Sequence, residues 1–467
     1  MTDELHFMEL TELAARLEAR EISPVEVTQL QLSRIAALDG QLHSYALVTP
    51  ESALAAAKSA EASIATGRYR GPLHGVPLAV KDLFWTKGIP TSGGMPMQRQ
   101  FCPLEDATVV ARLKDAGAVL LGKLQMAEGA YSDHHPAIDA PCNPWNPEVW
   151  PGISSSGPAV ATAAGLCYGA LASDTGGSIR WPCGANGLTG LKPTWGRVSR
   201  FGAMELAASL DHVGPIARSA RDVGAIFSIV SGRDERDPTS WLSPRPGPVL
   251  PASRLDKLRV GVDSRWSSED VDASVQRVIF QATEVFRGLG CQIVQVRAPD
   301  VAQSVIDWAP ACAVEAAVAH EATYPARKSE YGKVLAAVLE TGRSISAVEY
   351  QKIRLRRMEL TGRFSRLLED IDVLLIPVHP FAPLDLATIR TLGAQPELIL
   401  KLQRYTAPFD LTGQPTMTLP GGYTETGLPI GFQLVAAHWA EATLIDTSVA
   451  FQDATDWHTR HPPAPWR

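Results

Sequence analysis

Apolar and polar positions change their spacing along the chain, and each spacing predicts a type of element. In the first 65 residues the apolar positions follow a helical period, and a helix start stands at Ser23, with Pro24 as its first residue and Glu26 as its third. Further on, short apolar runs alternate with helical stretches. We expect strands at 118–121, 258–262 and 292–296, and helices at 108–115, 158–166 and 271–289. This order predicts an α/β fold with a helical N-terminal segment.

Composition and charge favour a globular protein without a nucleic-acid or membrane signal. The 467 residues are 45% hydrophobic and 20% charged, with a net charge of −7. The sequence has no Lys/Arg cluster and no apolar run near 18 residues, and its N-terminus is acidic and amphipathic. Its six cysteines are scattered, as is typical of reduced thiols. We therefore expect a soluble cytoplasmic protein that binds neither nucleic acid nor membrane.

A glycine-rich stretch from Pro151 to Pro193 carries the strongest chemical signal. Within it, Thr175, Gly176, Gly177 and Ser178 follow one another, and the two glycines lack the Cβ atoms that would prevent consecutive N–H groups from pointing into one concavity. Such N–H groups stabilise an oxyanion, and a serine hydroxyl beside them is placed to attack a carbonyl carbon. The pattern predicts Ser178 as a nucleophile and these four residues as its oxyanion hole.

A serine nucleophile needs a base, and the residues near Ser178 offer neither a GxSxG elbow nor an adjacent histidine. Lys81 follows the apolar run 76–80, which reads as a buried strand. Burial disfavours the ammonium form and lowers the lysine pKa from its usual value of about 10.4, so that a neutral amine can accept a proton. Lys81 is therefore the candidate base.

Three separated blocks with these residues resemble the amidase signature family: GPLHGVPLAVKD at 71–82, PGISSSG at 151–157 and DTGGSIRWP at 174–182. Further similarity covers 106–123, 187–213, 372–377 and 406–434. The resemblance implies a free-standing amidase with one large domain, 1–467, built on a mixed twisted sheet with helices on both faces. We expect its catalytic motifs at 71–215, a substrate-lining insertion at about 300–370, and an extended proline-rich connection at 243–253.

Transferred residue by residue, the resemblance implies that Ser178 is the acyl-forming nucleophile, Ser154 the bridging serine and Lys81 the base. Neutral Lys81 would take a proton from Ser154, which takes one from Ser178. The resemblance also implies that Ser155, Asp174 and Arg180 hold these residues in place through hydrogen bonds without transferring protons themselves.

The chain departs from the family pattern around the bridging serine. Ile153 and Ser156 stand where the family usually has glycine, and the family's bridging serine follows a cis peptide bond. A cis bond between two non-proline residues costs about 3 to 4 kcal/mol. The sequence leaves open whether Ile153–Ser154 is cis.

The implied activity is hydrolysis of an amide C–N bond, with aryl esters and carbamates (urethanes) as related substrates. Trp181 follows the nucleophile motif and, with Tyr131, Phe84, Trp85 and Trp145, predicts an apolar or aromatic pocket that favours anilides and aryl amides. The chemistry requires no cofactor and no metal, and its partner is a small-molecule amide. We expect a monomer or a homodimer.

Several alternatives stay open. The same family supplies the A subunit of glutamyl-tRNA amidotransferase, although that protein typically has a polar residue at the position of Trp181, and an inactive scaffold would keep the same fold. His134 and His135 are adjacent, which is poor geometry for one metal ion. Cys183 is close to Ser178, but the sequence shows no histidine and carboxylate arrangement for a cysteine nucleophile.

Overall fold

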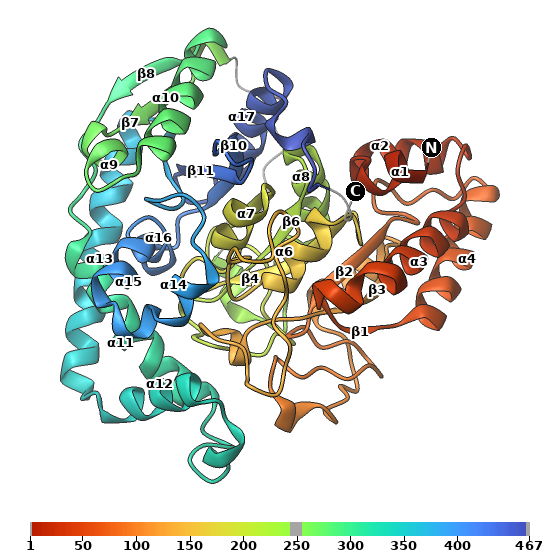
Figure 1. The fold of residues 1–467 in the computed structure, drawn as a ribbon, viewed down its shortest axis with the longest axis horizontal. Helices are drawn as coiled ribbons and strands as arrows, with labels where there is room; N and C mark the ends of the chain where they lie inside the picture. Colours follow the sequence, from red (N-terminus) through yellow and green to blue (C-terminus); the bar gives the residue numbers. More distant parts are fainter. Residues whose placement is uncertain (1, 243–254, 464–467) are drawn as a thin grey trace.

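Eleven strands form one mixed sheet in the computed structural model, which describes residues 2–242 and 255–463 (Figure 1). The strand order is β1-β3-β2-β4-β6-β5-β10-β11-β9-β7-β8. β2 is parallel to β3 and β4, β7 is parallel to β8 and β9, and the other neighbouring pairs are antiparallel. The strands are β1 (Tyr45–Val48), β2 (Pro77–Lys81), β3 (Val119–Leu124), β4 (Gly169–Asp174), β5 (Thr189–Lys192), β6 (His212–Ala217), β7 (Arg259–Val262), β8 (Gln292–Gln295), β9 (Val373–Pro377), β10 (Thr416–Tyr423) and β11 (Pro429–Ala436).

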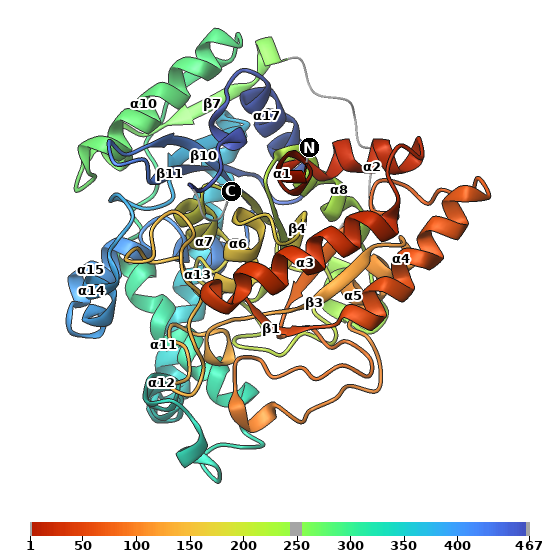
Figure 2. The same ribbon diagram turned by 45° about the vertical axis from the view of Figure 1, so that its right-hand side comes forward.

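Helices flank this sheet on both sides (Figures 1 and 2). α4 packs on β3, α8 on β5 and β6, and α10 and α17 on β10 and β11, while α11, α12 and α13 form a group beside α16. The predicted α/β fold is therefore confirmed. The helices are α1 (Thr2–Phe7), α2 (Leu10–Glu18), α3 (Pro24–Leu42), α4 (Pro50–Ala65), α5 (Thr108–Asp115), α6 (Ser156–Ala163), α7 (Arg180–Asn186), α8 (Ala220–Val230), α9 (Ser264–Ser268), α10 (Ala273–Gly288), α11 (Ala302–Ala319), α12 (Lys333–Ser344), α13 (Ala347–Asp370), α14 (Leu386–Arg390), α15 (Pro396–Gln403), α16 (Ala407–Thr412) and α17 (Glu441–Asp453).

Local sequence signals locate several elements correctly. The Ser23 side chain accepts hydrogen bonds from the N–H groups of Val25 and Glu26, and the Glu26 side chain accepts one from the Ser23 N–H, so the predicted capping box starts α3. α5 has the predicted bounds, and β7, β8 and α10 lie within two residues of theirs. α6 starts two residues earlier than expected, at Ser156. The connection expected at 243–253 lies outside the described residues.

The N-terminal segment is not helical throughout. β1 interrupts it between α3 and α4 and pairs antiparallel with β3 at the edge of the sheet. Gly122 permits this pairing, because a Cβ at that position would lie 2.2 Å from the Leu47 carbonyl oxygen. A strand of four residues between two helices is too short to give a periodic pattern of its own.

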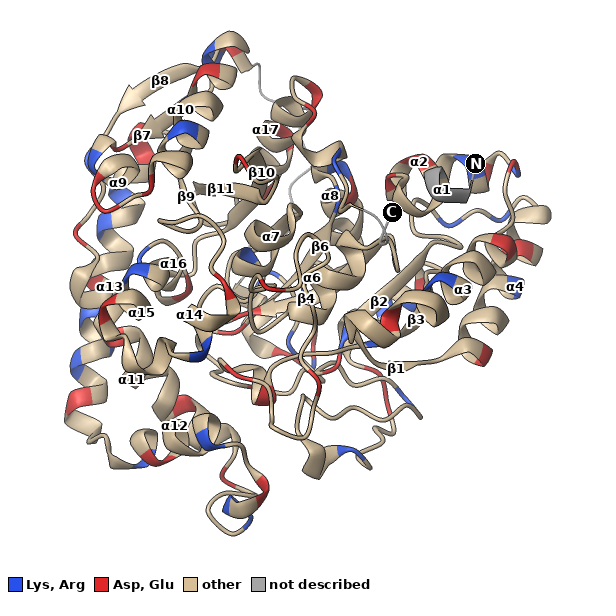
Figure 3. Ribbon diagram, in the orientation of Figure 1, with Lys and Arg blue, Asp and Glu red and all other residues tan. Residues whose placement is uncertain are grey.

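One hydrophobic cluster joins distant parts of the chain and includes Leu10, Val80, Val223, Phe286 and Phe432. Charged residues lie mainly on the outer helices and loops, and both signs are interspersed along α13 (Figure 3). Every residue of β2 and β4 is buried. The charged side chains in this interior are therefore exceptions that need partners.

Candidate active site

The turn with Ser178 joins β4 to α7. The Asp174 carboxylate, at the end of β4, accepts hydrogen bonds from the Gly177 N–H at 2.7 Å and the Ile179 N–H at 2.9 Å. It therefore closes the turn and satisfies donors at the start of α7. Ser178 is 6% exposed, and its hydroxyl makes no hydrogen bond to any described residue. This leaves the hydroxyl available to a ligand.

Two tryptophans pack on the glycines of this turn. A Cβ at Gly176 would lie 2.3 Å from the Trp308 ring, and a Cβ at Gly177, whose φ is +136°, would lie 2.5 Å from the Trp181 ring. The Trp308 indole N–H also donates to the Thr175 carbonyl at 2.8 Å. Packing therefore requires glycine at both positions, and the backbone conformation requires it at Gly177 as well.

The structure corrects one part of the predicted oxyanion hole. The Gly177 N–H is donated to Asp174, so it is not available to a ligand. The N–H groups of Thr175, Gly176 and Ser178 have no acceptor within the described part of the chain. Because the C=O and N–H of a trans peptide point in opposite directions, the bond from Trp308 to the Thr175 carbonyl directs the Gly176 N–H away from that indole.

Lys81 lies at the end of β2 with 0% of its surface exposed. Its Nζ is within hydrogen-bond distance of three hydroxyls: Ser154 at 2.8 Å, Ser155 at 2.9 Å and Ser173 at 2.9 Å. Burial lowers the pKa of Lys81 to about 7, although the charges of nearby aspartates partly oppose this. A substantial fraction of Lys81 is thus neutral at neutral pH. The structure brings the predicted base, the predicted bridging serine and Ser155 together.

The segment around Ser154 is completely buried. The Ile153–Ser154 peptide bond is cis, and the Ser154 carbonyl accepts a hydrogen bond from the Ala127 N–H at 3.2 Å. α6 begins two residues later, with Pro158 in its first turn, where proline is tolerated. The departures from the family pattern at Ile153 and Ser156 therefore coexist with the cis bond.

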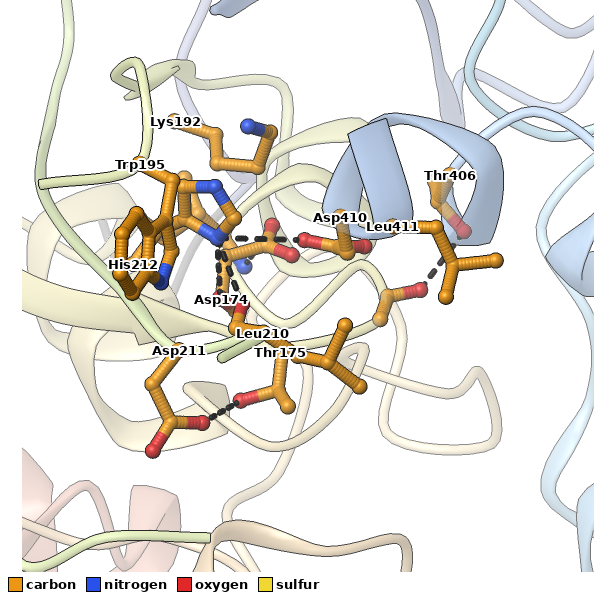
Figure 4. Close-up of polar contacts among 12 residues, drawn as sticks. Asp174, Thr175, Lys192, Trp195, Leu210, Asp211, His212, Thr406, Asp410 and Leu411 are labelled. Atoms are coloured by element: carbon orange, nitrogen blue, oxygen red, sulfur yellow. Dashed lines mark hydrogen bonds and ion pairs between the residues drawn. The ribbon is translucent and has the colours of Figure 1, made fainter. Parts of the chain in front are cut away.

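Buried polar and charged side chains hold the turn in place, and Figure 4 shows three of their contacts: His212 with Asp410, Thr175 with Asp211, and Thr406 with the Gly176 carbonyl. The Arg180 guanidinium donates to Asp174 at 2.8 Å, to Asp410 of α16 at 2.5 Å and to the Thr406 carbonyl at 2.9 Å. Burial alone would raise the pKa of Asp174, but Arg180 more than offsets this and holds that pKa well below its usual range. Burial raises the pKa of Asp410. His212, 3.6 Å from Asp410, has its pKa lowered by burial.

Aromatic residues surround the turn. Trp150 lies 6.1 Å from Trp181 and 6.2 Å from His379 between ring centroids, and Tyr131 stacks on Trp308 at 6.4 Å. Trp181 and His379 are more than nine-tenths buried, yet Trp181 Nε1 and His379 Nε2 have no hydrogen-bond partner among the described residues. Burial lowers the pKa of His379 to about 3, so this ring is neutral near neutral pH. These rings pack beside the turn as a mainly apolar group that holds two buried polar atoms without a partner in the described residues.

Three other predicted aromatic residues lie elsewhere. Phe84 has 0% of its surface exposed, so we do not include it in the pocket proposed below. Trp85 packs edge-on against Phe101. The Trp145 indole donates to the Asn186 carbonyl.

Sequence reasoning missed Trp308, Thr406, Asp410, Trp150 and His379. Trp308 lies on α11, inside the segment 300–370 that the sequence assigns to a substrate-lining insertion, but no local motif distinguishes it. Thr406 and Asp410 are more than 220 residues from the turn they support. Only the fold brings such residues together.

The structure gives little support to a metal site at His134 and His135 or to Cys183 as a nucleophile. His134 Nε2 lies 3.0 Å from Ser156 Oγ while His135 Nδ1 accepts the Ala137 N–H, and no group of three metal-ligating side chains occurs among the described residues. Cys183 is buried and its thiol pKa is raised well above the usual value, which disfavours a thiolate. No helix in the described ranges is long and apolar enough to span a membrane.

Comparison with known proteins gives matches over nearly the whole chain. A sequence model of the family described as Amidase matches residues 26–445. The Mycobacterium tuberculosis protein that bears the name amidase AmiD is 46% identical over 462 residues, with 99% of this chain and 97% of that protein covered. The A subunit of glutamyl-tRNA(Gln) amidotransferase from Methylococcus capsulatus is 39% identical, with 98% and 99% covered. The native peptide amidase from Stenotrophomonas maltophilia has a TM-score of 0.84 at 28% identity, with 98% of each chain covered.

Proposed function

Because the chain belongs to the amidase family, we propose that it hydrolyses amide C–N bonds through an acyl intermediate on Ser178, with Ser154 as the proton bridge and Lys81 as the base. The observation that carries this proposal is the position of Lys81 Nζ among the hydroxyls of Ser154, Ser155 and Ser173.

The hydrogen bonds around Lys81 favour a proton path through Ser154. The Ser155 hydroxyl donates to the Ser173 carbonyl at 3.1 Å, so its oxygen accepts from Lys81. A neutral amine has two N–H donors and one lone pair. If the donors serve Ser155 and Ser173, the lone pair accepts the Ser154 proton, and Ser154 in turn accepts the proton of Ser178 as that serine attacks. The same path in reverse protonates the leaving amine, and water then releases the acyl group.

The oxyanion of the tetrahedral intermediate would lie among the N–H groups of Thr175, Gly176 and Ser178. Donors that are already oriented stabilise the developing charge without reorganisation, and the loss of one such donor typically costs about 10²–10³ in rate. Asp174 and Arg180 act here by holding the turn, as their mutual hydrogen bonds support.

For the substrate, we propose an apolar or aryl acyl group bound against Trp181, Trp150 and His379, with Tyr131 and Trp308 on the other side of the turn. The position of Trp308 on α11 supports a substrate-lining role for the segment 300–370. No charged side chain is among these five, so amides and anilides, with related aryl esters and carbamates, suit the surface better than charged amino-acid amides.

A second candidate is the A subunit of a glutamyl-tRNA amidotransferase, which the 39% identity to the Methylococcus capsulatus protein favours. The large apolar ring of Trp181 beside Gly177 disfavours it, because a glutamine side chain is polar.

The six cysteines are all free, which supports a reducing, cytoplasmic location. We keep a monomer or homodimer as the expected assembly.

The deciding experiment measures product release by the purified chain from matched aryl amide, aryl ester and aryl carbamate substrates, with Ser178→Ala as the control. We expect turnover that the variant loses, and stoichiometric labelling of Ser178 by an aryl phosphonate. Equal turnover of charged and aryl amides would contradict the proposed pocket. Absence of turnover and of labelling would contradict the acyl-serine mechanism.

A further inference from the structure

The loop after the short 3-10 helix Glu128–Ala130 brings a histidine to the proposed proton path. His134 Nε2 lies 3.0 Å from the Oγ of Ser156, the first residue of α6 and two positions after Ser154. Burial, and then the charge of Lys81, lower the pKa of His134 to about 4. The imidazole is therefore neutral near neutral pH, and it interacts electrostatically with Lys81.

The hydrogen bonds of Ser156 fix the tautomer of this histidine. Ser156 is fully buried, and its hydroxyl has no partner among the described residues other than His134 Nε2. A buried hydroxyl that fails to donate costs about 1–3 kcal/mol. Ser156 therefore donates to Nε2, and the His134 proton resides on Nδ1. Nδ1 has no partner in the described part of the chain, and the side chain is partly exposed, so one N–H donor is left for a ligand.

The same loop connects both sides of the site. Three residues before His134, Tyr131 stacks on Trp308, which donates to the Thr175 carbonyl of the nucleophile turn. At the other end of the loop His134 contacts Ser156, which follows Ser154 and Ser155, two serines that contact Lys81. In the proposed mechanism the Ser154 and Lys81 side of the site is where the leaving amine receives its proton. His134 thus lies on the leaving-amine side.

We propose that the His134 Nδ1–H binds an acceptor oxygen in the amine part of the substrate, and that Ser156 is the positioning residue that holds this tautomer. The preferred substrates would then be amides whose amine part has a carbonyl group one carbon away from the scissile nitrogen, as in glycinamide. This inference rests on the proposed amidase function. A net hydrogen bond of ordinary strength corresponds to about a 5- to 10-fold preference.

The test compares two amides that share one aryl acyl group, one with glycinamide and one with isobutylamine, which has the same branched arrangement of heavy atoms but no acceptor oxygen. The ratio of their kcat/KM values is measured for the wild type, His134→Gln, His134→Ala and Ser156→Ala. Ratios are compared between proteins because the two amines differ in basicity. His135→Ala is the matched control, since the hydrogen bond of the His135 ring is with the Ala137 N–H of the same loop.

We expect the glycinamide preference to fall about 5- to 10-fold in both His134 variants, mainly through KM, and to stay at the wild-type value in His135→Ala. An unchanged ratio in the His134 variants of an active enzyme overturns this inference and leaves the proposed function intact. Loss of all turnover already in the wild type counts against the proposed function instead.

Nitrogen NMR of ¹⁵N-histidine-labelled protein tests the tautomer without any turnover. We expect Nδ1–H on His134 in the wild type and a mixture of tautomers in Ser156→Ala. An Nε2–H tautomer in the wild type would overturn the inference whatever the activity.

Discussion

Replacing Lys81 by Met tests the low lysine pKa through protein stability. Lys81 has a pKa of about 7 in the folded protein and an ordinary value of 10.5. Between these values the unfolded state binds more protons than the folded state, so the wild type becomes more stable as pH rises from 7 toward 10.5. Methionine has nearly the same length and does not titrate. The variant therefore lacks this pH dependence.

The size of the effect follows from the two pKa values. At pH 6 the buried ammonium lowers the free energy of unfolding by about 5 kcal/mol, because a shift of one pKa unit corresponds to about 1.4 kcal/mol. At pH 9 the remaining cost is about 2 kcal/mol. The difference in free energy of unfolding between variant and wild type should thus move by about 3 kcal/mol between the two pH values, in favour of the variant at pH 6. The variant also loses three hydrogen bonds, but that loss is nearly independent of pH.

The assay is thermal unfolding of both proteins from pH 6 to pH 9, with Ser173→Ala as a control that keeps the lysine. For a chain of this length, 1 kcal/mol corresponds to roughly 1 °C in Tm, so we expect the Tm difference to change by about 3 °C. A constant difference across this range would refute the low pKa of Lys81 and, with it, the neutral-lysine base.

The remaining predictions concern catalysis and are measured as kcat/KM on an aryl amide. The wild-type value should rise about tenfold per pH unit below pH 7 and level off above it, because only neutral Lys81 acts as a base; a maximum below pH 6 would contradict this. Ser154→Ala should lose about 10²–10⁴ in rate through the missing proton bridge while its Tm stays close to the wild-type value, and full activity would exclude the relay. Gly177→Ala should be inactive, since its Cβ meets Trp181, and a rescued activity in Gly177→Ala/Trp181→Ala would identify this clash as the cause.

Sequence reasoning succeeded where a property is local. Lys81 follows an apolar run, and that run is indeed a buried strand, so desolvation of its side chain was predictable. The capping box at Ser23 was predictable for the same reason. The sequence predicted Phe84 in a pocket, but its side chain is fully buried in the structure, and no signal in the sequence identified Trp150 and His379, whose neighbourhood depends on strand order. Proximity along the chain therefore does not identify the residues of a pocket.

Two residues that bind the carbonyls of the nucleophile turn could not be identified from the sequence, because they lie far from the turn along the chain. The Thr175 carbonyl is bound by Trp308 of α11, and the Gly176 carbonyl by Thr406 at 2.7 Å, immediately before α16. In a trans peptide the N–H of the next residue points opposite to the carbonyl. The bond from Trp308 to the Thr175 carbonyl therefore orients the Gly176 N–H. The bond from Thr406 to the Gly176 carbonyl orients the Gly177 N–H, which is donated to Asp174. The motif supplies the glycines, but two distant segments orient their amides. We therefore expect Trp308→Phe, which removes the N–H donor and keeps a smaller aromatic ring, to lower kcat on an aryl amide.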